Sequence, residues 1–194
     1  MEKELINKLL TYTPSFSTQE IEMGLSLFEE KTYQAQSFIT QAGTVCDWLF
    51  YAESSITRCL YFDSDSEEQT LWMKPEKTFI TEYKSFVNRD PSQFSLQFYE
   101  DTRVWQISRD NLLHLFGESK NWAQFGISLT EQVHITLIDV FVNLLANDAT
   151  RNYQYIEYQF PRFIEVAPLK DIASMLQISQ VSLSRIRAGK QLKK

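Results

Sequence analysis

The residues whose types and spacing most clearly suggest a chemical role lie near the C-terminus. Gln180, Val181, Ser184, Arg185 and Ala188 fall at i, i+1, i+4, i+5 and i+8, so a helix would place them on one face. An arginine can donate two parallel hydrogen bonds to guanine, a glutamine suits adenine, and a valine suits the thymine methyl group. A small polar face of this kind, free of acidic residues, fits the major groove of DNA.

The rest of this segment agrees with a recognition helix. Leu183 and Ile186 point away from the polar face and would pack inward. Ser179 is well placed as the N-cap, and Ser179 and Ser182 are candidates for phosphate contacts that position the helix. The alternative is a helical hairpin that only closes a domain. We favour DNA binding because the outer face lacks bulk and acid.

The preceding segment has the pattern of a partner helix. Pro168 suits a first helical position, and Asp171 suits the positive end of the helix dipole. Residues 177–179 interrupt the pattern, which predicts a helix-turn-helix. The apolar face consists of residues spaced at i, i+3, i+4 and i+7, namely Leu169, Ile172, Ala173 and Leu176.

Residues 168–187, PLKDIASMLQISQVSLSRIR, resemble the DNA-binding end of the catabolite-activator/FNR-type (Crp/Fnr) family of bacterial transcription regulators. The resemblance implies an α+β chain with three parts. These are a cyclic-nucleotide-binding-type, jelly-roll-like β-roll in residues 1–118, a dimerisation helix in 119–147 and a winged helix-turn-helix domain in 148–194. The chain ends soon after the recognition helix, so we expect the wing to be reduced or absent.

The periodicity upstream agrees with these parts. Residues 1–30 have helical spacing, and the period changes to two between residues 31 and 107, which predicts a sandwich or barrel of short strands. Turn-rich breaks separate the strand candidates. The expected strands lie at residues 37–40, 48–52, 55–62, 69–73, 79–81, 94–99 and 104–107.

A long helix is predicted for residues 120–147, where no proline occurs. Its apolar residues occupy more than one side, so more than one side must be covered. One cover would be the β-roll, and the other would be the same helix of a second subunit. A single buried core helix is the alternative. The expected dimer contacts are Leu129, Val133, Leu137, Val140 and Leu144.

The ligand loop departs from the family pattern. In the family, a Gly-Glu pair and a later Arg-Ser or Arg-Thr pair hold the cyclic phosphate and the ribose. Here Thr81 and Glu82 stand at the first pair, Ser92 and Gln93 stand near the second, and Arg89 comes several residues early. An uncompensated buried phosphate is costly, so we do not expect cyclic AMP or cyclic GMP as the effector.

Composition bounds the class of protein. The net charge is −6, but the chain from Arg162 onward carries +5, which is typical of a basic reading unit on an acidic body. No apolar run was found that would cross a bilayer, and the N-terminus lacks a signal peptide, so we expect a cytoplasmic protein. Cys46 and Cys59 are expected to be free thiols. No phosphate-binding glycine loop, metal motif or nucleophile motif indicates an enzyme.

The resulting hypothesis is a homodimeric transcription regulator that reads an inverted-repeat operator on double-stranded DNA, with no cofactor. RNA polymerase and an unidentified small-molecule effector are further partners to consider, and no membrane partner is expected. The rival hypothesis is a degenerate interaction module without sequence-specific DNA binding. Gln177 replaces the glycine usual in the turn, which should cost stability if that position needs positive φ.

Overall fold

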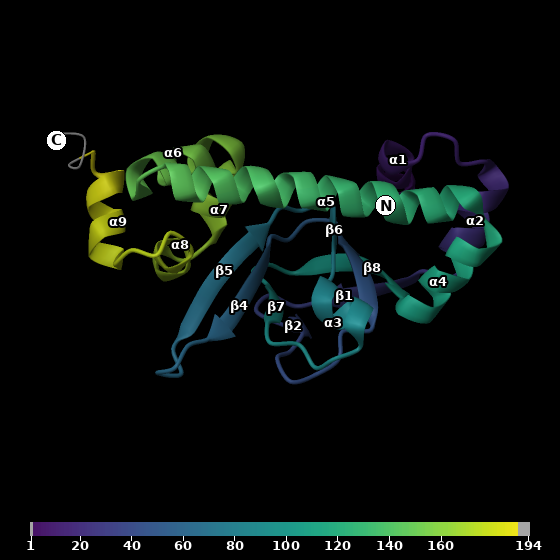
Figure 1. Ribbon diagram of the computed structural model, residues 1–194, viewed down its shortest axis with the longest axis horizontal. Helices are drawn as coiled ribbons and strands as arrows, with labels where there is room; N and C mark the ends of the chain where they lie inside the picture. The colour runs from purple at the N-terminus through teal and green to yellow at the C-terminus, as the bar shows by residue number, and fades with distance from the viewer. Residues whose placement is uncertain (1, 190–194) are drawn as a thin grey trace.

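The computed structural model describes residues 2–189. Within this range the chain is α+β, with a β-roll between helices at both ends (Figure 1). The elements are, in order, α1 Glu2–Tyr12, α2 Thr18–Leu25, β1 Glu29–Tyr33, β2 Phe38–Thr40, β3 Trp48–Ala52, β4 Thr57–Phe62, β5 Glu68–Lys74, β6 Thr78–Ile80, α3 Tyr83–Asn88, β7 Ser95–Phe98, β8 Thr102–Ser108, α4 Arg109–Glu118, α5 Lys120–Ala146, α6 Ala149–Gln159, α7 Pro161–Val166, α8 Leu169–Met175 and α9 Gln180–Arg187.

The roll consists of two antiparallel sheets, as the period-two pattern predicts. One sheet has the strand order β1-β8-β3-β6 and the other β2-β7-β4-β5. Because side chains alternate across a strand, each strand sends every second residue between the sheets. The residues buried there are Cys46, Phe50, Ala52, Cys59, Ile80, Leu96, Phe98 and Val104.

Helices that precede and follow the roll in the sequence cover the outer face of the first sheet. Leu5 and Leu9 of α1 share a buried cluster with Trp122 and Phe125 of α5 and with residues of β3, β6 and β8. Gly24 in α2 makes this packing possible, because a Cβ atom there would clash with the Trp122 ring. The first turns of α5 are thus fixed to the roll.

The C-terminal helices α6–α9, called the head below, pack on the second sheet through α8, which lies against β5. Ile56, Met73 and Tyr99 of the roll share a buried cluster with residues of the head. In Figure 1, α5 runs along the whole molecule, from the N-terminal helices at one end to the head at the other. The head therefore both follows α5 in the chain and packs on the roll.

Three short elements add detail that the periodicity does not show. Helix α3 has only six residues, too few to show a helical period. Pro161 follows the end of α6 at Gln159 and occupies the first turn of α7, where its missing N–H costs nothing. Pro168 is the N-cap of α8, one position before its expected place.

Helix α5 corrects a further expectation. By length and composition it is long and apolar enough to cross a membrane, whereas the sequence was thought to hold no such run. Two of its residues, Trp122 and Phe125, are nevertheless buried in the cluster on the outer face of the first sheet. Glu131 and Asp139 also interrupt its apolar surface with charge. These features favour a helix that packs against protein.

Candidate nucleic-acid interface

Helix α9 begins and packs as its sequence predicts. Ser179 is the N-cap, and its Oγ accepts a hydrogen bond from the Ser182 backbone N–H at 3.1 Å. The two serine hydroxyls also lie 2.9 Å apart. Leu183 and Ile186 are buried. Ser179 therefore caps the helix and is exposed, whereas Ser182 is half-buried.

The opposite face of α9 is open to solvent. All five of its residues are exposed, and Val181, the bulkiest apolar one, is 62% exposed. We call this set, Gln180, Val181, Ser184, Arg185 and Ala188, the reading face. Arg185 and Arg187 add positive charge in the last turn, and Arg185 forms no salt bridge with any residue that the structure describes. The polar groups of the reading face are free to bind a partner.

The turn between α8 and α9 is strained as expected. Gln177 has a φ of 55°, in the left-handed region that a glycine adopts at little cost. The condition for the predicted cost, a positive φ at this position, is thus met. The wing was expected to be reduced or absent, and that expectation concerns the chain beyond the described residues. The basic residues Lys190, Lys193 and Lys194 also lie outside them.

Helix α8 supports α9 from behind, but one of its residues has a role that the sequence did not reveal. Ile172, Ala173 and Leu176 are buried against the head's own core, as their spacing predicts. Asp171 lies in the first turn of the helix, as expected, but is only 2% exposed. Its carboxylate meets Arg58 and Tyr99 of the roll. No local pattern links residues so far apart in the chain.

The four predicted ligand-pocket residues lie in the segment 79–94, and three of them bond within the protein. Glu82 is 8% exposed and caps α3 by accepting a hydrogen bond from the Ser85 N–H at 3.0 Å. The Thr81 hydroxyl donates to the Trp48 carbonyl at 2.9 Å. The Ser92 hydroxyl donates to the carbonyl of Phe94 at 2.8 Å and accepts from its N–H at 3.0 Å. Gln93 points to solvent.

The arginine nearest to this segment is also engaged. Arg89 ends α3 in a left-handed conformation, with a φ of 66°. Its guanidinium pairs with Asp47 and donates to the Cys46 carbonyl. Cys46 and Cys59 are free and buried inside the roll, and burial raises the pKa of Cys59 to about 12. Among residues 2–189, no group of histidine, cysteine and acidic side chains could hold a metal ion.

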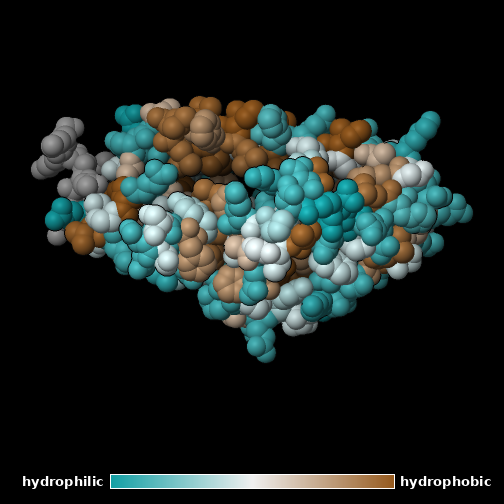
Figure 2. Space-filling model, turned by 60° about the horizontal axis from the view of Figure 1, so that its bottom comes forward, coloured by the Kyte–Doolittle hydropathy of each residue, from teal (hydrophilic) through white to brown (hydrophobic). Residues whose placement is uncertain are grey.

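The predicted dimer contacts on α5 change in exposure along the helix. Leu129 still packs against the roll cluster, and Val133 and Val140 are half-buried. Leu137 and Leu144 are exposed. Figure 2 shows hydrophobic side chains gathered along the upper edge of the molecule, toward the head. The large exposed apolar residues of α5 are Ile127, Ile135, Leu137, Ile138, Phe141, Val142, Leu144 and Leu145.

Comparison with known proteins finds similarity to this chain in structure but not in sequence. No family model matches the sequence, and no curated protein matches it. Among solved structures, the c-di-GMP responsive global regulator CLP of Xanthomonas campestris is similar, with a TM-score of 0.70 at 17% identity over 90% of this chain and 92% of that one.

Two further structures align over most of their length. FixK2 of Bradyrhizobium japonicum has a TM-score of 0.70 at 15% identity, covering 84% of this chain and 83% of that one. A putative transcriptional regulator of the Crp/Fnr family from Eubacterium rectale has a TM-score of 0.70 at 13% identity, covering 93% and 86%. The chain therefore has the fold of the Crp/Fnr-type regulators, with a cyclic-nucleotide-binding-type β-roll and a long helix.

Proposed function

We propose that the protein is a DNA-binding transcription regulator of the cytoplasm whose α8–α9 pair is a helix-turn-helix and whose reading face enters the major groove. The observation that carries this proposal is the exposure of Gln180, Ser184 and Arg185 on one face of a capped helix. Arg185 would donate two hydrogen bonds to guanine, a contact that contributes about 1–3 kcal/mol of discrimination between bases. The likeness to solved transcription regulators supports the proposal.

The second part of the proposal is a homodimer formed through α5. Past its first turns this helix carries apolar side chains to solvent, and Phe141 is 62% exposed. An exposed apolar patch of this extent on a protein surface is typical of a protein–protein interface. The same helix of a second copy offers a matching apolar stripe, and pairing about a two-fold axis would present two reading faces to an inverted repeat.

The third part concerns the effector. We propose that the segment 79–94 does not hold cyclic AMP or cyclic GMP, because Glu82, Ser92 and Arg89 are already bonded within the protein. Binding a ligand would first break these hydrogen bonds, and the new contacts would only replace the free energy lost in breaking them. Three regions serve as the proposed units, namely residues 1–118 for the roll, 119–147 for the dimer helix and 148–194 for DNA binding.

Selection of the purified protein against a random duplex library tests DNA reading. We expect an inverted repeat to be enriched by the wild type and lost in Arg185→Ala, with guanine at the position that Arg185 contacts. Arg109→Ala, which removes an arginine from α4 on the roll side, is the matched control and should enrich the same repeat. Weak, salt-sensitive binding without enrichment in every variant would contradict the proposal and favour the interaction module.

Sedimentation tests the dimer. Phe141→Asp and Leu137→Asp place a charge on the apolar surface of α5, and we expect both variants to sediment as monomers at concentrations where the wild type is a dimer. Val87→Asp is the control, because Val87 is also exposed and apolar but lies on α3. A wild-type monomer, or dimers in all four proteins, would contradict pairing through α5.

A further inference from the structure

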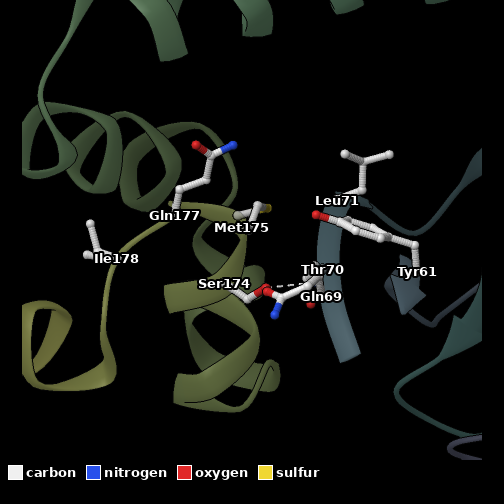
Figure 3. Close-up of a pocket in the computed structure, with 8 residues that line it drawn as sticks. All are labelled: Tyr61, Gln69, Thr70, Leu71, Ser174, Met175, Gln177 and Ile178. Atoms are coloured by element: carbon white, nitrogen blue, oxygen red, sulfur yellow. Dashed lines mark hydrogen bonds between the residues drawn. The ribbon is translucent and has the colours of Figure 1, made fainter. Parts of the chain in front are cut away.

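The head packs on the roll across a seam between α8 and strands β4 and β5. The seam is mainly apolar, with Ile56 and Met73 from the roll and Ile172 and Ala173 from α8 in one buried cluster. At its edge the Ser174 hydroxyl of α8 donates to the Gln69 side chain and accepts from the Thr70 N–H, both at 2.8 Å (Figure 3). This contact joins α8 directly to the backbone of β5.

Inside the seam lies a buried polar cluster, here called the latch, formed by Arg58, Tyr99 and Asp171. The Arg58 guanidinium lies 3.2 Å from one Asp171 carboxylate oxygen, and the Tyr99 hydroxyl donates to the other at 2.8 Å. Arg58 is 3% exposed and is itself held by Glu68 at 3.0 Å and Thr70 at 2.8 Å. Both partners of the Asp171 carboxylate therefore belong to the roll.

The latch determines position more than stability. A buried ion pair gains little over apolar packing, because both charges lose their water, but a displaced partner leaves an uncompensated charge. Sliding α8 by one turn would separate Asp171 from both Arg58 and Tyr99. Burial, and then the charge of Asp171, raise the pKa of Tyr99, so its hydroxyl remains a donor at neutral pH. The latch therefore specifies one orientation of the head.

This orientation leaves the reading face uncovered. Gln180, Ser184 and Arg185 are exposed while α8 is docked, so docking does not compete with DNA for these side chains. A docked head instead has a fixed position relative to α5, which also packs on the roll. In a dimer joined through α5, the latch in each subunit would fix the separation of the two recognition helices.

We propose that Arg58, Tyr99 and Asp171 are positioning residues that set the half-site spacing this protein accepts. The inference rests on the proposed function and deepens it, since it assigns spacing to the roll and base reading to α9. Releasing the head would leave each recognition helix able to bind a half-site. The dimer would then pay the ordering cost of both heads when it binds a full site, and would tolerate altered spacers.

The probes are the inverted repeat returned by the library selection, the same repeat with a longer or shorter spacer, and a single half-site. For Asp171→Asn we expect the preference for the native spacer to fall roughly tenfold while half-site affinity stays unchanged. Tyr99→Phe removes one hydrogen bond and keeps the ring, so it should give a smaller loss in the same direction and guards against a folding defect. Arg103→Met, which removes an arginine paired with Glu30 and Glu53 within the roll, should change neither quantity.

Two outcomes would overturn the inference. One is an unchanged spacer preference in Asp171→Asn and Tyr99→Phe, and the other is an equal loss on half-site and full site, which would indicate a purely structural role.

A crosslinking experiment separates failure of the latch from failure of DNA binding. Cysteines at Gln69 and Ser174, whose side chains are in contact, should crosslink rapidly when the head is docked. We expect Asp171→Asn to slow this crosslinking without DNA present. If no duplex is enriched but crosslinking slows, the latch stands and the proposed function fails. Equal crosslinking rates in both backgrounds would overturn the latch whatever the protein binds.

Discussion

Two polar regions of this molecule, the segment 79–94 and the reading face of α9, contain similar kinds of side chain in opposite states. Glu82 and Ser92 bond to neighbouring backbone, and Arg89 bonds to Asp47. Gln180 and Arg185 extend into solvent from a helix that is capped by other residues. Residue type alone would have ranked both regions as binding sites.

The difference lies in hydrogen-bonding capacity that remains unused. A buried polar group must be satisfied within the protein, and once satisfied it has little to offer a ligand. Solvated groups exchange water for a partner at lower cost. The comparison teaches that side chains of the same types can either bond within the fold or remain open to solvent, and the following experiments test that distinction.

The largest effect should come from Arg185→Lys. Lysine keeps the charge but lacks the planar fork, so we expect a loss of about 1–3 kcal/mol in discrimination at the contacted guanine, with non-specific binding retained. Competition between the selected duplex and a guanine-substituted duplex measures this. Glu82→Gln, the counterpart in the segment 79–94, should change the affinity for neither the selected duplex nor the guanine-substituted duplex. Equal losses of base discrimination in the two variants would contradict the difference between the reading face and the segment 79–94.

Glu82→Ala should instead destabilise the fold. Removing an N-cap costs about 1 kcal/mol of unfolding free energy, and α3 has no other side-chain cap at that end. Urea denaturation followed by tryptophan fluorescence gives the value. Asp90→Ala, an exposed acid in the same segment, serves as the control and should leave the unfolding free energy unchanged. A neutral Glu82→Ala would show that the carboxylate is free for a ligand after all.

Cyclic AMP should produce no change in the unfolding midpoint of the wild type. A ligand that binds the native state at 100 times its Kd would stabilise it by about 2.7 kcal/mol, a shift that calorimetry detects easily. Cyclic GMP should behave identically, because both require the same phosphate contacts. A saturable rise in the midpoint that Glu82→Gln abolishes would contradict our view of the segment 79–94.

Among the variants expected to change stability, the smallest effect concerns Glu20, a carboxylate engaged by the protein yet partly open to water. Hydrogen bonds from Ser119, Ser17 and Asn121 lower its pKa from 4.5 to about 2. A depressed pKa contributes stability above pH 4.5, and this contribution is lost as the pH falls toward 2. The midpoint difference between wild type and Glu20→Gln should therefore be largest near neutrality and narrow below pH 4.5.

Much of the architecture could be predicted because regular spacing of apolar residues marks its strands and helices. Alternation in residues 55–62 and 94–99 foretold β4 and β7, and helical spacing foretold α5, α8 and α9. The reading face followed from the same periodicity, together with the N-cap at Ser179. Gln177 was expected to cost stability if the turn needs positive φ there, and its φ is positive.

What could not be predicted depends on contacts between distant residues. Asp171 meets Arg58 across more than a hundred positions of sequence, and no local pattern encodes that pairing. The hydrogen bonds that Thr81, Glu82 and Ser92 form within the protein could not be predicted either, because only three-dimensional neighbours reveal them. Short helices such as α3 also escape, since they lack the length to show a period.

The strand order of the first sheet has a consequence for biosynthesis. Strand β8 lies between β1 and β3, so the sheet cannot close until residue 108 has left the ribosome. The N-terminal helix must wait still longer, because Leu5 and Leu9 pack with Trp122 and Phe125 of α5. Pairings so distant in sequence impose slow loop closure, and they leave early strands exposed during synthesis. The nascent chain is therefore most prone to aggregate just before α5 emerges.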